Sequence, residues 1–156
     1  MYKIVISRML YLIVFFFCGG STQSQNRLSK NEIGLNFFRN PSIGLEYRYR
    51  AFSVHSGIYV TNFERNRTWR FFKSGLTFWF LPVGNSVHPS SFYVQLNFLR
   101  GLNLDYKNRH AFSSDIGYRL MLLKGLQARL GITGIIAKNK PVKINPTPSI
   151  NYSFFF

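Results

Sequence analysis

Three stretches of the chain place a histidine near a serine, the residue types that a hydrolase with a serine nucleophile uses. They are His55 beside Ser56, His88 near Ser90, and His110 with Ser113 and Asp115. Adjacent side chains of an extended strand point to opposite faces, so His55 and Ser56 cannot contact each other directly if that stretch is a strand. The best candidate for catalysis is therefore the set of His110, Ser113 and Asp115, in which Ser113 and Asp115 share a face and His110 belongs to the polar loop before them.

Other kinds of chemistry lack a matching pattern in this sequence. There is no glycine-rich phosphate loop, no pair of carboxylates at catalytic spacing and no cluster with metal-ligand spacing. Cys18 is the one cysteine, and it lies in the N-terminal stretch that we expect to be removed. Disulfides and thiolate metal sites are then not expected. We predict no metal and no cofactor, and we expect the protein not to be an enzyme.

The elements that must hold these side chains are strands, because residues alternate between apolar and polar along the chain after residue 25. This period of two is typical of strands with one apolar face, and no segment there shows a helical period. In the clearest segment, 92–98, Phe, Val, Leu and Phe alternate with Tyr, Gln and Asn. Eight such segments are expected, at about 33–37, 43–49, 52–61, 72–80, 92–98, 112–120, 126–136 and 150–156.

Charged side chains occur in the middle of these segments, on the face opposite the large apolar residues. A closed barrel of about eight strands has an interior that side chains fill, so charges that point inward must pair with one another. We predict an ionic network in the interior with a structural role, formed by Glu46, Arg48, Lys73, Asp115, Arg119 and Arg129.

The first 24 residues have the pattern of a secretory signal peptide. Lys3 and Arg8 precede an apolar stretch of about nine residues, and small and polar residues follow it. The stretch is well short of the roughly 20 residues that a membrane-spanning helix needs. Cleavage is expected after Gly20, Ser21 or Ser24, with Ser24 preferred. The alternatives are an uncleaved anchor or lipidation at Cys18.

The predicted organisation is therefore a signal peptide at 1–24, a short lead-in at 25–31 and a β-barrel at 32–156. Aromatic residues make up 18% of the chain and charged residues 16%, against a usual charged fraction of about 25%. An exported chain with a very aromatic outer face and charges on the other face fits a lipid environment, where backbone groups are satisfied only in helices or closed barrels. The alternative is an exported soluble β-protein with its apolar face in a core.

The last seven residues resemble the final strand of Gram-negative outer-membrane proteins. Ile150, Tyr152, Phe154 and Phe156 alternate with polar or aromatic neighbours, and the resemblance implies that the barrel-assembly machinery reads this pattern. With the signal peptide and the alternating segments, the chain looks like the small eight-stranded barrels of the OmpA, OmpX and opacity-protein kind. This resemblance implies an antiparallel up-and-down transmembrane β-barrel in the cell outer membrane, porin-like in architecture and expected to be a monomer.

In that topology both chain ends lie in the periplasm, and the connections at 39–42, 64–67, 100–111 and 137–147 face outward. A connection at 81–90 would then be periplasmic, which is unusual because periplasmic turns are normally short. Without Lys3 and Arg8 the chain carries 18 basic and five acidic residues. We expect a barrel that is structural or that binds lipopolysaccharide or other surface ligands through an extracellular basic rim. Charge-assisted bonds would hold the phosphates of lipopolysaccharide at this rim, which is formed by Arg65, Arg67, Lys107, Arg109, Lys138, Lys140 and Lys143.

The alternative for this rim is a solvated loop surface that binds no specific ligand. A second alternative for the whole chain is a hydrolase that modifies lipid A, since some eight-stranded outer-membrane barrels do so. However, the chain lacks the His-x-Ser-Asn sequence of lipid A deacylases. Nucleic-acid binding is disfavoured, because export separates the chain from nucleic acid and no fold-specific motif accompanies the charge.

Overall fold

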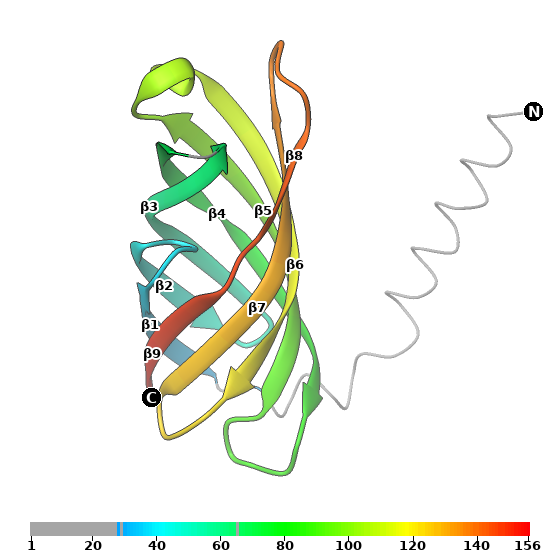
Figure 1. The fold of residues 1–156 in the computed structure, drawn as a ribbon. Helices are drawn as coiled ribbons and strands as arrows, with labels where there is room; N and C mark the ends of the chain where they lie inside the picture. Colours follow the sequence, from blue (N-terminus) through cyan, green and yellow to red (C-terminus); the bar gives the residue numbers. More distant parts are fainter. Residues whose placement is uncertain (1–27, 29, 65) are drawn as a thin grey trace, which may run out of the picture.

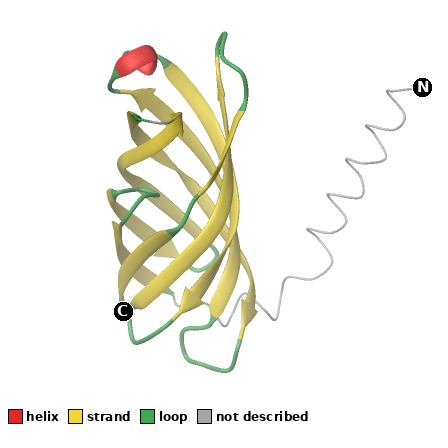
Figure 2. Ribbon diagram, viewed as in Figure 1, coloured by secondary structure: helices red, strands yellow, loops and turns green. Residues whose placement is uncertain are grey.

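The computed structural model describes Leu28 and residues 30–64 and 66–156. The predicted signal peptide, and residues 25–27 and 29 of the predicted lead-in, lie outside the described residues. Strands make up most of the described chain, and a single-turn 3-10 helix, η2 (Leu104–Tyr106), lies in one connection (Figure 2). The strands are β1 Asn31–Phe37, β2 Ile43–Tyr49, β3 Phe52–Glu64, β4 Arg67–Val83, β5 Ser90–Gly101, β6 His110–Met121, β7 Leu126–Ala137, β8 Lys143–Pro146 and β9 Ser149–Phe155.

The strands form one closed antiparallel barrel, in which each strand from β1 to β7 pairs with the next along the chain and β9 pairs with both β1 and β7 (Figure 1). β8 and β9 both pair with β7, and Pro148 lies in the short break between them. They therefore occupy a single position in the wall, and the barrel has eight strand positions. The predicted all-β antiparallel barrel of eight strands is confirmed.

The two faces of the wall have opposite character. Leu96 is 64% exposed, Leu130 69% and Tyr152 40%, and all three point outward. Arg119 is 0% exposed and Arg129 3%, and both point into the barrel. Because side chains alternate between the faces of a strand, the apolar and polar sets of the sequence separate onto the outside and the inside. The charged side chains thus lie in the barrel interior, and the apolar side chains form the outer surface.

The connections gather at two ends of the barrel. The lower end in Figure 1 holds the 50–51, 84–89 and 122–125 connections and the end of β9, and the upper end holds the 38–42, 102–109 and 138–142 connections and the turn at Asn66. The expected 81–90 connection is therefore shorter than predicted, because β4 continues to Val83. The 137–147 connection is also shorter, because β8 already pairs with β7.

The upper rim is uneven because the strands differ in length. β4 has 17 residues, whereas β1, β2 and β9 have seven each, and the turn between β1 and β2 lies below the other upper connections (Figure 1). Above that turn, β8 is paired with β7 alone among the described residues. The Asn145 side chain bridges from β8 to β3, where its Nδ2 donates to Thr61 Oγ1 and to Tyr59 Oη, the latter at 3.4 Å.

Candidate functional site

Glu32 is the centre of an ionic cluster in the lower half of the interior. Its carboxylate is 3% exposed and pairs with Arg48 and with Arg119, whose Nη1 lies 3.2 Å from Glu32 Oε2. It also accepts hydrogen bonds from Gln127 Nε2 at 2.8 Å and from Ser153 Oγ at 2.6 Å. One carboxylate thus connects strands β1, β2, β6, β7 and β9 across the barrel.

A second carboxylate and a tryptophan complete this lower cluster. Glu46 accepts from Arg129 Nη1 at 2.7 Å and from Ser53 Oγ at 2.5 Å. The guanidinium carbons of Arg119, Arg129 and Arg48 lie 4.6, 4.9 and 5.4 Å from the centroid of the Trp79 ring. Cation–π attraction is strongest when the cation is desolvated, so the indole of Trp79 helps to hold three buried guanidiniums close together.

A fourth buried ion pair, formed by a third carboxylate, lies higher in the barrel. Lys73 Nζ is 2.6 Å from Asp115 Oδ2 and 2.7 Å from Asn40 Oδ1, and all three side chains are buried. Asn40 belongs to the short turn between β1 and β2, so that turn contributes to the interior. Asp115 also accepts from Thr133 Oγ1 and, at 3.3 Å, from Asn97 Nδ2. The carboxylate is thus surrounded by donors.

The interior network has more cations than carboxylates. Among the described buried residues, four cations face three carboxylates, and the structure places all six predicted network residues inside the barrel. Glu32 was missing from the predicted set, although its carboxylate contacts four side chains, as many as the carboxylate of Asp115 does. The charge-assisted bonds cross the interior and link strands on opposite sides of the barrel. The network therefore fixes the positions of the strands relative to one another.

Apolar side chains fill the barrel near each end. The upper cluster packs Tyr106 of η2 into the barrel against Phe71, with ring centroids 5.2 Å apart in an edge-on arrangement. A Cβ on Gly101 would lie 1.8 Å from the Tyr106 carbonyl oxygen, so this connection lies directly against the end of β5. The members of the upper cluster are Tyr59, Trp69, Phe71, Leu99, Tyr106, Ala111, Ile135 and Ala137. The lower cluster consists of Leu28, Ala51, Trp79 and Tyr93.

The predicted catalytic set does not assemble. His110 is the first residue of β6 rather than a loop residue, and its exposed ring stacks on Phe98 at 5.2 Å on the outer face. Ser113 and Asp115 point into the barrel, where Ser113 Oγ accepts a hydrogen bond from Asn97 Nδ2 at 3.0 Å. The wall thus separates the histidine from the serine and the aspartate. This candidate is wrong, because His110 and Ser113 have opposite parity along one strand.

The other two histidine–serine pairs also fail to form. His55 is buried and its Nε2 lies 2.7 Å from Asn97 Oδ1, whereas Ser56 is exposed on the outer face. His88 stacks on Phe155 with ring centroids 3.6 Å apart, and burial lowers the pKa of His88 from its ordinary value. Ser90 Oγ instead accepts from the backbone N–H of Met121 at 3.1 Å.

Within residues 28, 30–64 and 66–156, no group of three or more histidine, cysteine, aspartate and glutamate side chains could hold a metal ion. No helix in this part of the chain is long and apolar enough to cross a membrane.

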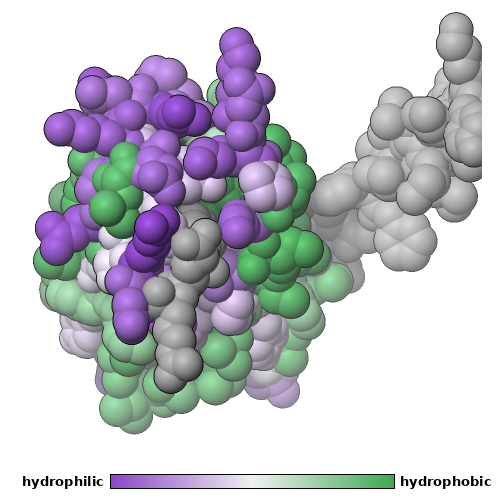
Figure 3. Space-filling model, turned by 45° about the horizontal axis from the view of Figure 1, so that its top comes forward, coloured by the Kyte–Doolittle hydropathy of each residue, from purple (hydrophilic) through white to green (hydrophobic). Residues whose placement is uncertain are grey.

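The upper end of the barrel is strongly basic. Figure 3, in which this end is turned forward, shows hydrophilic side chains gathered there above a largely hydrophobic flank. Of the predicted rim, Arg67 lies 3.8 Å from Asp105 in an exposed ion pair, and Lys140 Nζ lies 5.7 Å from the Tyr106 ring centroid. Arg65 lies outside the described residues. The remaining predicted rim residues are at the same end, namely Lys107, Arg109, Lys138 and Lys143.

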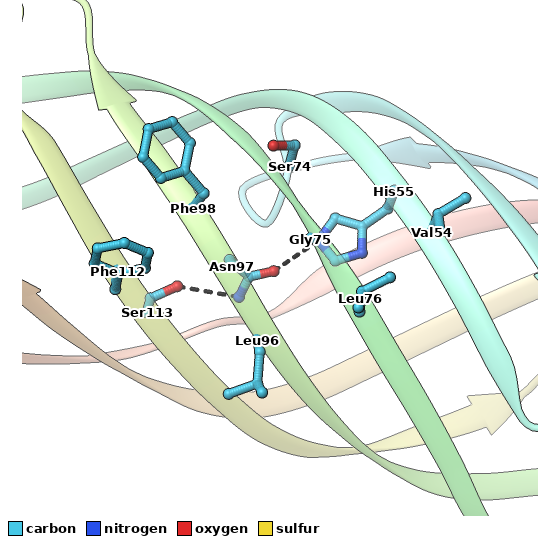
Figure 4. Close-up of a pocket in the computed structure, with 10 residues that line it drawn as sticks. All are labelled: Val54, His55, Ser74, Gly75, Leu76, Leu96, Asn97, Phe98, Phe112 and Ser113. Atoms are coloured by element: carbon cyan, nitrogen blue, oxygen red, sulfur yellow. Dashed lines mark hydrogen bonds between the residues drawn. The ribbon is translucent and has the colours of Figure 1, made fainter.

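A groove of about 630 Å³ lies on the outer face of the wall over β3 to β6 (Figure 4). Its outward-pointing side chains are Val54, Leu76, Leu96, Phe98 and Phe112, with the smaller Ser74 beside them, and Gly75 and the buried His55, Asn97 and Ser113 also line it. Ser74 pairs with Phe98 on β5 and Ser56 on β3, so small hydroxyl side chains lie beside large rings in one row. Ser74 is smaller than the other outward side chains that line the groove, and it leaves space beside Phe98.

The outer face of β9 carries the side chains of the predicted assembly signal. Ile150, Tyr152 and Phe154 are 45%, 40% and 51% exposed, and Phe156 is 66% exposed beyond the end of the strand.

Comparisons with protein-family models, with curated proteins and with solved structures found no match to this chain.

Proposed function

We propose that this chain is a non-enzymatic β-barrel of the Gram-negative outer membrane, whose basic upper end binds the phosphates of lipopolysaccharide. The observation that carries the proposal is the inverted wall, which is apolar outside and ionic inside. Water favours the opposite arrangement, because buried ions lose several kcal/mol of hydration each and exposed apolar surface costs roughly 25 cal/mol per Å². A hydrocarbon environment favours the observed arrangement, with apolar side chains outside and ionic side chains inside.

The extent of the apolar outer face also supports a bilayer. Soluble monomers rarely expose a contiguous apolar patch of more than a few hundred Å². Here most of the outward side chains are large and apolar, as for Leu45 at 59%, Leu76 at 62% and Ile116 at 59% exposure. β5, β6 and β7 have 12 residues each, against the 9–11 that a tilted strand needs to cross the hydrocarbon core.

The ends of the sequence agree with this location. Residues 1–24 have the pattern of an export signal, which would bring the chain to the periplasm. The outward Ile150, Tyr152 and Phe154 are accessible on β9, as recognition by a barrel-assembly machinery requires.

The distribution of charge sets the proposed orientation. The described upper connections and strand ends carry Arg39, Arg67, Lys107, Arg109, Lys138, Lys140 and Lys143, whereas the described lower end has Lys30, Arg50 and Lys124. Lipopolysaccharide presents phosphates at the outer surface, and arginine and lysine bind phosphate through charge-assisted hydrogen bonds. The upper end therefore faces outward in this proposal.

Cell fractionation tests the location. The chain is expected in the outer-membrane fraction, and its band should shift on a detergent gel between unheated and boiled samples. Recovery from the soluble periplasmic fraction, without such a shift, would identify an exported soluble β-protein instead. Mass spectrometry of lipid A from cells with and without the gene should show identical species, and a change in acylation would favour the hydrolase alternative.

A charge-neutralising variant tests the rim. Changing Lys138, Lys140 and Lys143 together to glutamine should lower the amount of lipopolysaccharide that co-purifies with the barrel. The matched control changes Lys30, Arg50 and Lys124, which lie at the lower end, to glutamine. Equal retention by the two variants would reject a specific rim.

A further inference from the structure

Two arginines point outward on the wall directly above the groove over β3 to β6. Arg100 on β5 is paired with Phe72 on β4 and with His110 on β6, and Arg70 lies two residues above Phe72. Both arginine side chains are exposed. Because they have the same parity as the outward residues of their strands, their guanidiniums lie on the outer face rather than in the barrel.

The spacing places these charges close to the apolar groove. Arg100 is two residues above Phe98, and Arg70 is four residues above Ser74. A strand rises about 3.3 Å per residue, so the two backbone positions are roughly 7 and 13 Å above the groove residues. Long arginine side chains can cover part of such a distance. The result is a continuous surface with two cations at its upper edge and the apolar groove, here called the trough, below them.

The trough is lined by neighbouring apolar side chains. Leu76 and Leu96 are paired on β4 and β5, and Phe98 and Phe112 are paired on β5 and β6, with ring centroids 5.7 Å apart. Ser74 is paired with Phe98 and lies two residues from Leu76 on β4, where it presents a small side chain (Figure 4). An acyl chain in the trough would contact side chains along both of its sides. An acyl chain on a flat part of the wall makes such contacts on one side only, so dispersion attraction favours the trough.

We infer that this surface is a binding site for one lipid A molecule, with a phosphate against Arg70 and Arg100 and an acyl chain in the trough. The inference rests on the proposed function, and it names a discrete site on the wall in addition to the rim. Charge complementarity selects the occupant, because two guanidiniums at the upper edge of an apolar groove match an acylated, phosphorylated lipid. The guanidinium fork binds phosphate oxygens in pairs, which adds geometric specificity. The basic connections immediately above would favour the outer-leaflet lipid over the phospholipid of the inner leaflet.

Native mass spectrometry of the detergent-purified barrel, titrated with bisphosphorylated lipid A, tests the site. Changing Arg70 and Arg100 together to glutamine should weaken binding about tenfold, and Ser74→Phe, which fills the trough, should do the same. Ser74→Ala leaves the trough open and should bind as the unchanged protein does. Ala128→Phe adds an equal ring on the outer face of β7 and should also have no effect.

Two further comparisons separate one site from two independent effects. Combining the arginine changes with Ser74→Phe should weaken the binding of one and the same lipid A molecule further and should not affect a second bound lipid, since both changes act on a single site. Dephosphorylated lipid A should bind the unchanged protein and the arginine variant equally. Loss of two separately bound lipid A molecules in the combined variant, or loss of phosphatidylglycerol binding equal to the loss of lipid A binding, would overturn the inference.

The outcomes also distinguish this inference from the proposed function. If the arginine and trough variants bind lipid A normally while the rim variant does not, the wall site is wrong and the rim stands. If the chain fractionates as a soluble protein, the proposed function fails and the wall site fails with it. A heat-dependent gel shift for each variant verifies that the barrel has folded.

Discussion

Removing the Asp115 carboxylate should destabilise the barrel far more than removing an exposed carboxylate. Asp115 is 0% exposed and lies 2.6 Å from the buried ammonium of Lys73. In Asp115→Ala the ammonium keeps one hydrogen bond, to Asn40 Oδ1 at 2.7 Å, and loses its counter-charge. Breaking a buried ion pair by removing one partner typically costs about 3–5 kcal/mol. We expect a loss of this size in the free energy of unfolding.

The exposed pair of Arg67 and Asp105 provides the control. Its atoms are 3.8 Å apart and its side chains are more than half exposed, so water and salt screen the attraction. Exposed pairs contribute about 0–1 kcal/mol. Asp105→Ala should therefore change the free energy of unfolding by less than about 1 kcal/mol.

Urea titration of the barrel folded in phospholipid vesicles measures both variants. A third variant, with Lys73→Met and Asp115→Leu together, should lose less stability than Asp115→Ala, because it leaves no unpaired charge in the interior. A loss for Asp115→Ala no larger than that for Asp105→Ala would refute the reasoning. It would mean that water reaches the interior and solvates Lys73 there.

Two other predictions concern the upper connection and the last strand. Gly101→Ala should increase trypsin cleavage in the outer connection that carries Tyr106, because the new Cβ would lie 1.8 Å from a backbone oxygen of that connection. Gly134→Ala should leave cleavage unchanged, because nothing lies within 4 Å of its added Cβ. Equal cleavage of the two variants would show that the connection does not pack against the end of β5. Changing Tyr152 and Phe154 together to serine should lower the amount of barrel in the outer-membrane fraction at equal synthesis, and undiminished levels would argue against their recognition during assembly.

The alternation of residues was sufficient to predict the faces of the wall. Phe92, Leu96 and Phe98 point outward and Gln95 and Asn97 inward, as their parity requires. A period of two leaves little freedom once a segment is a strand, because shifting by one residue would bring every charge to the outside. The eight strand positions followed from counting these segments.

The sequence was less informative at the ends of segments. Glu32 was not predicted to join the network because it lies at the boundary of the lead-in, where alternation has only begun. Lys143–Pro146 lies within the predicted 137–147 connection, but in the structure it pairs with β7 as strand β8. Proline is tolerated there because Pro146 lies on a strand that pairs on a single side among the described residues.

The apolar clusters could not be predicted from alternation. Trp69, Phe71 and Trp79 point inward although they are apolar, and their neighbours Phe72 and Phe78 are aromatic as well. Where both faces of a strand are aromatic, hydrophobicity carries no information about direction. The packing of Tyr106 into the upper end depends on the path of the 102–109 connection, which no local pattern in the sequence specifies.

The candidate site shows the same limit. Proximity of His110, Ser113 and Asp115 in the sequence suggested a catalytic set, but the strand directs His110 away from the other two. The groove at Ser74 depends on which residues of β4, β5 and β6 lie side by side. That register is a tertiary property, and it became visible only in the folded barrel.

The accessibility of spin labels on the outer wall tests the central claim most directly. Labels at Leu96 and Leu130, in the barrel reconstituted into vesicles, should collide often with molecular oxygen and rarely with a water-soluble nickel complex, whereas a label at Lys107 should show the reverse. Hydrocarbon is expected around the first two positions. Nickel collisions at Leu96 and Leu130 as frequent as at Lys107 would place the apolar face in water and contradict it.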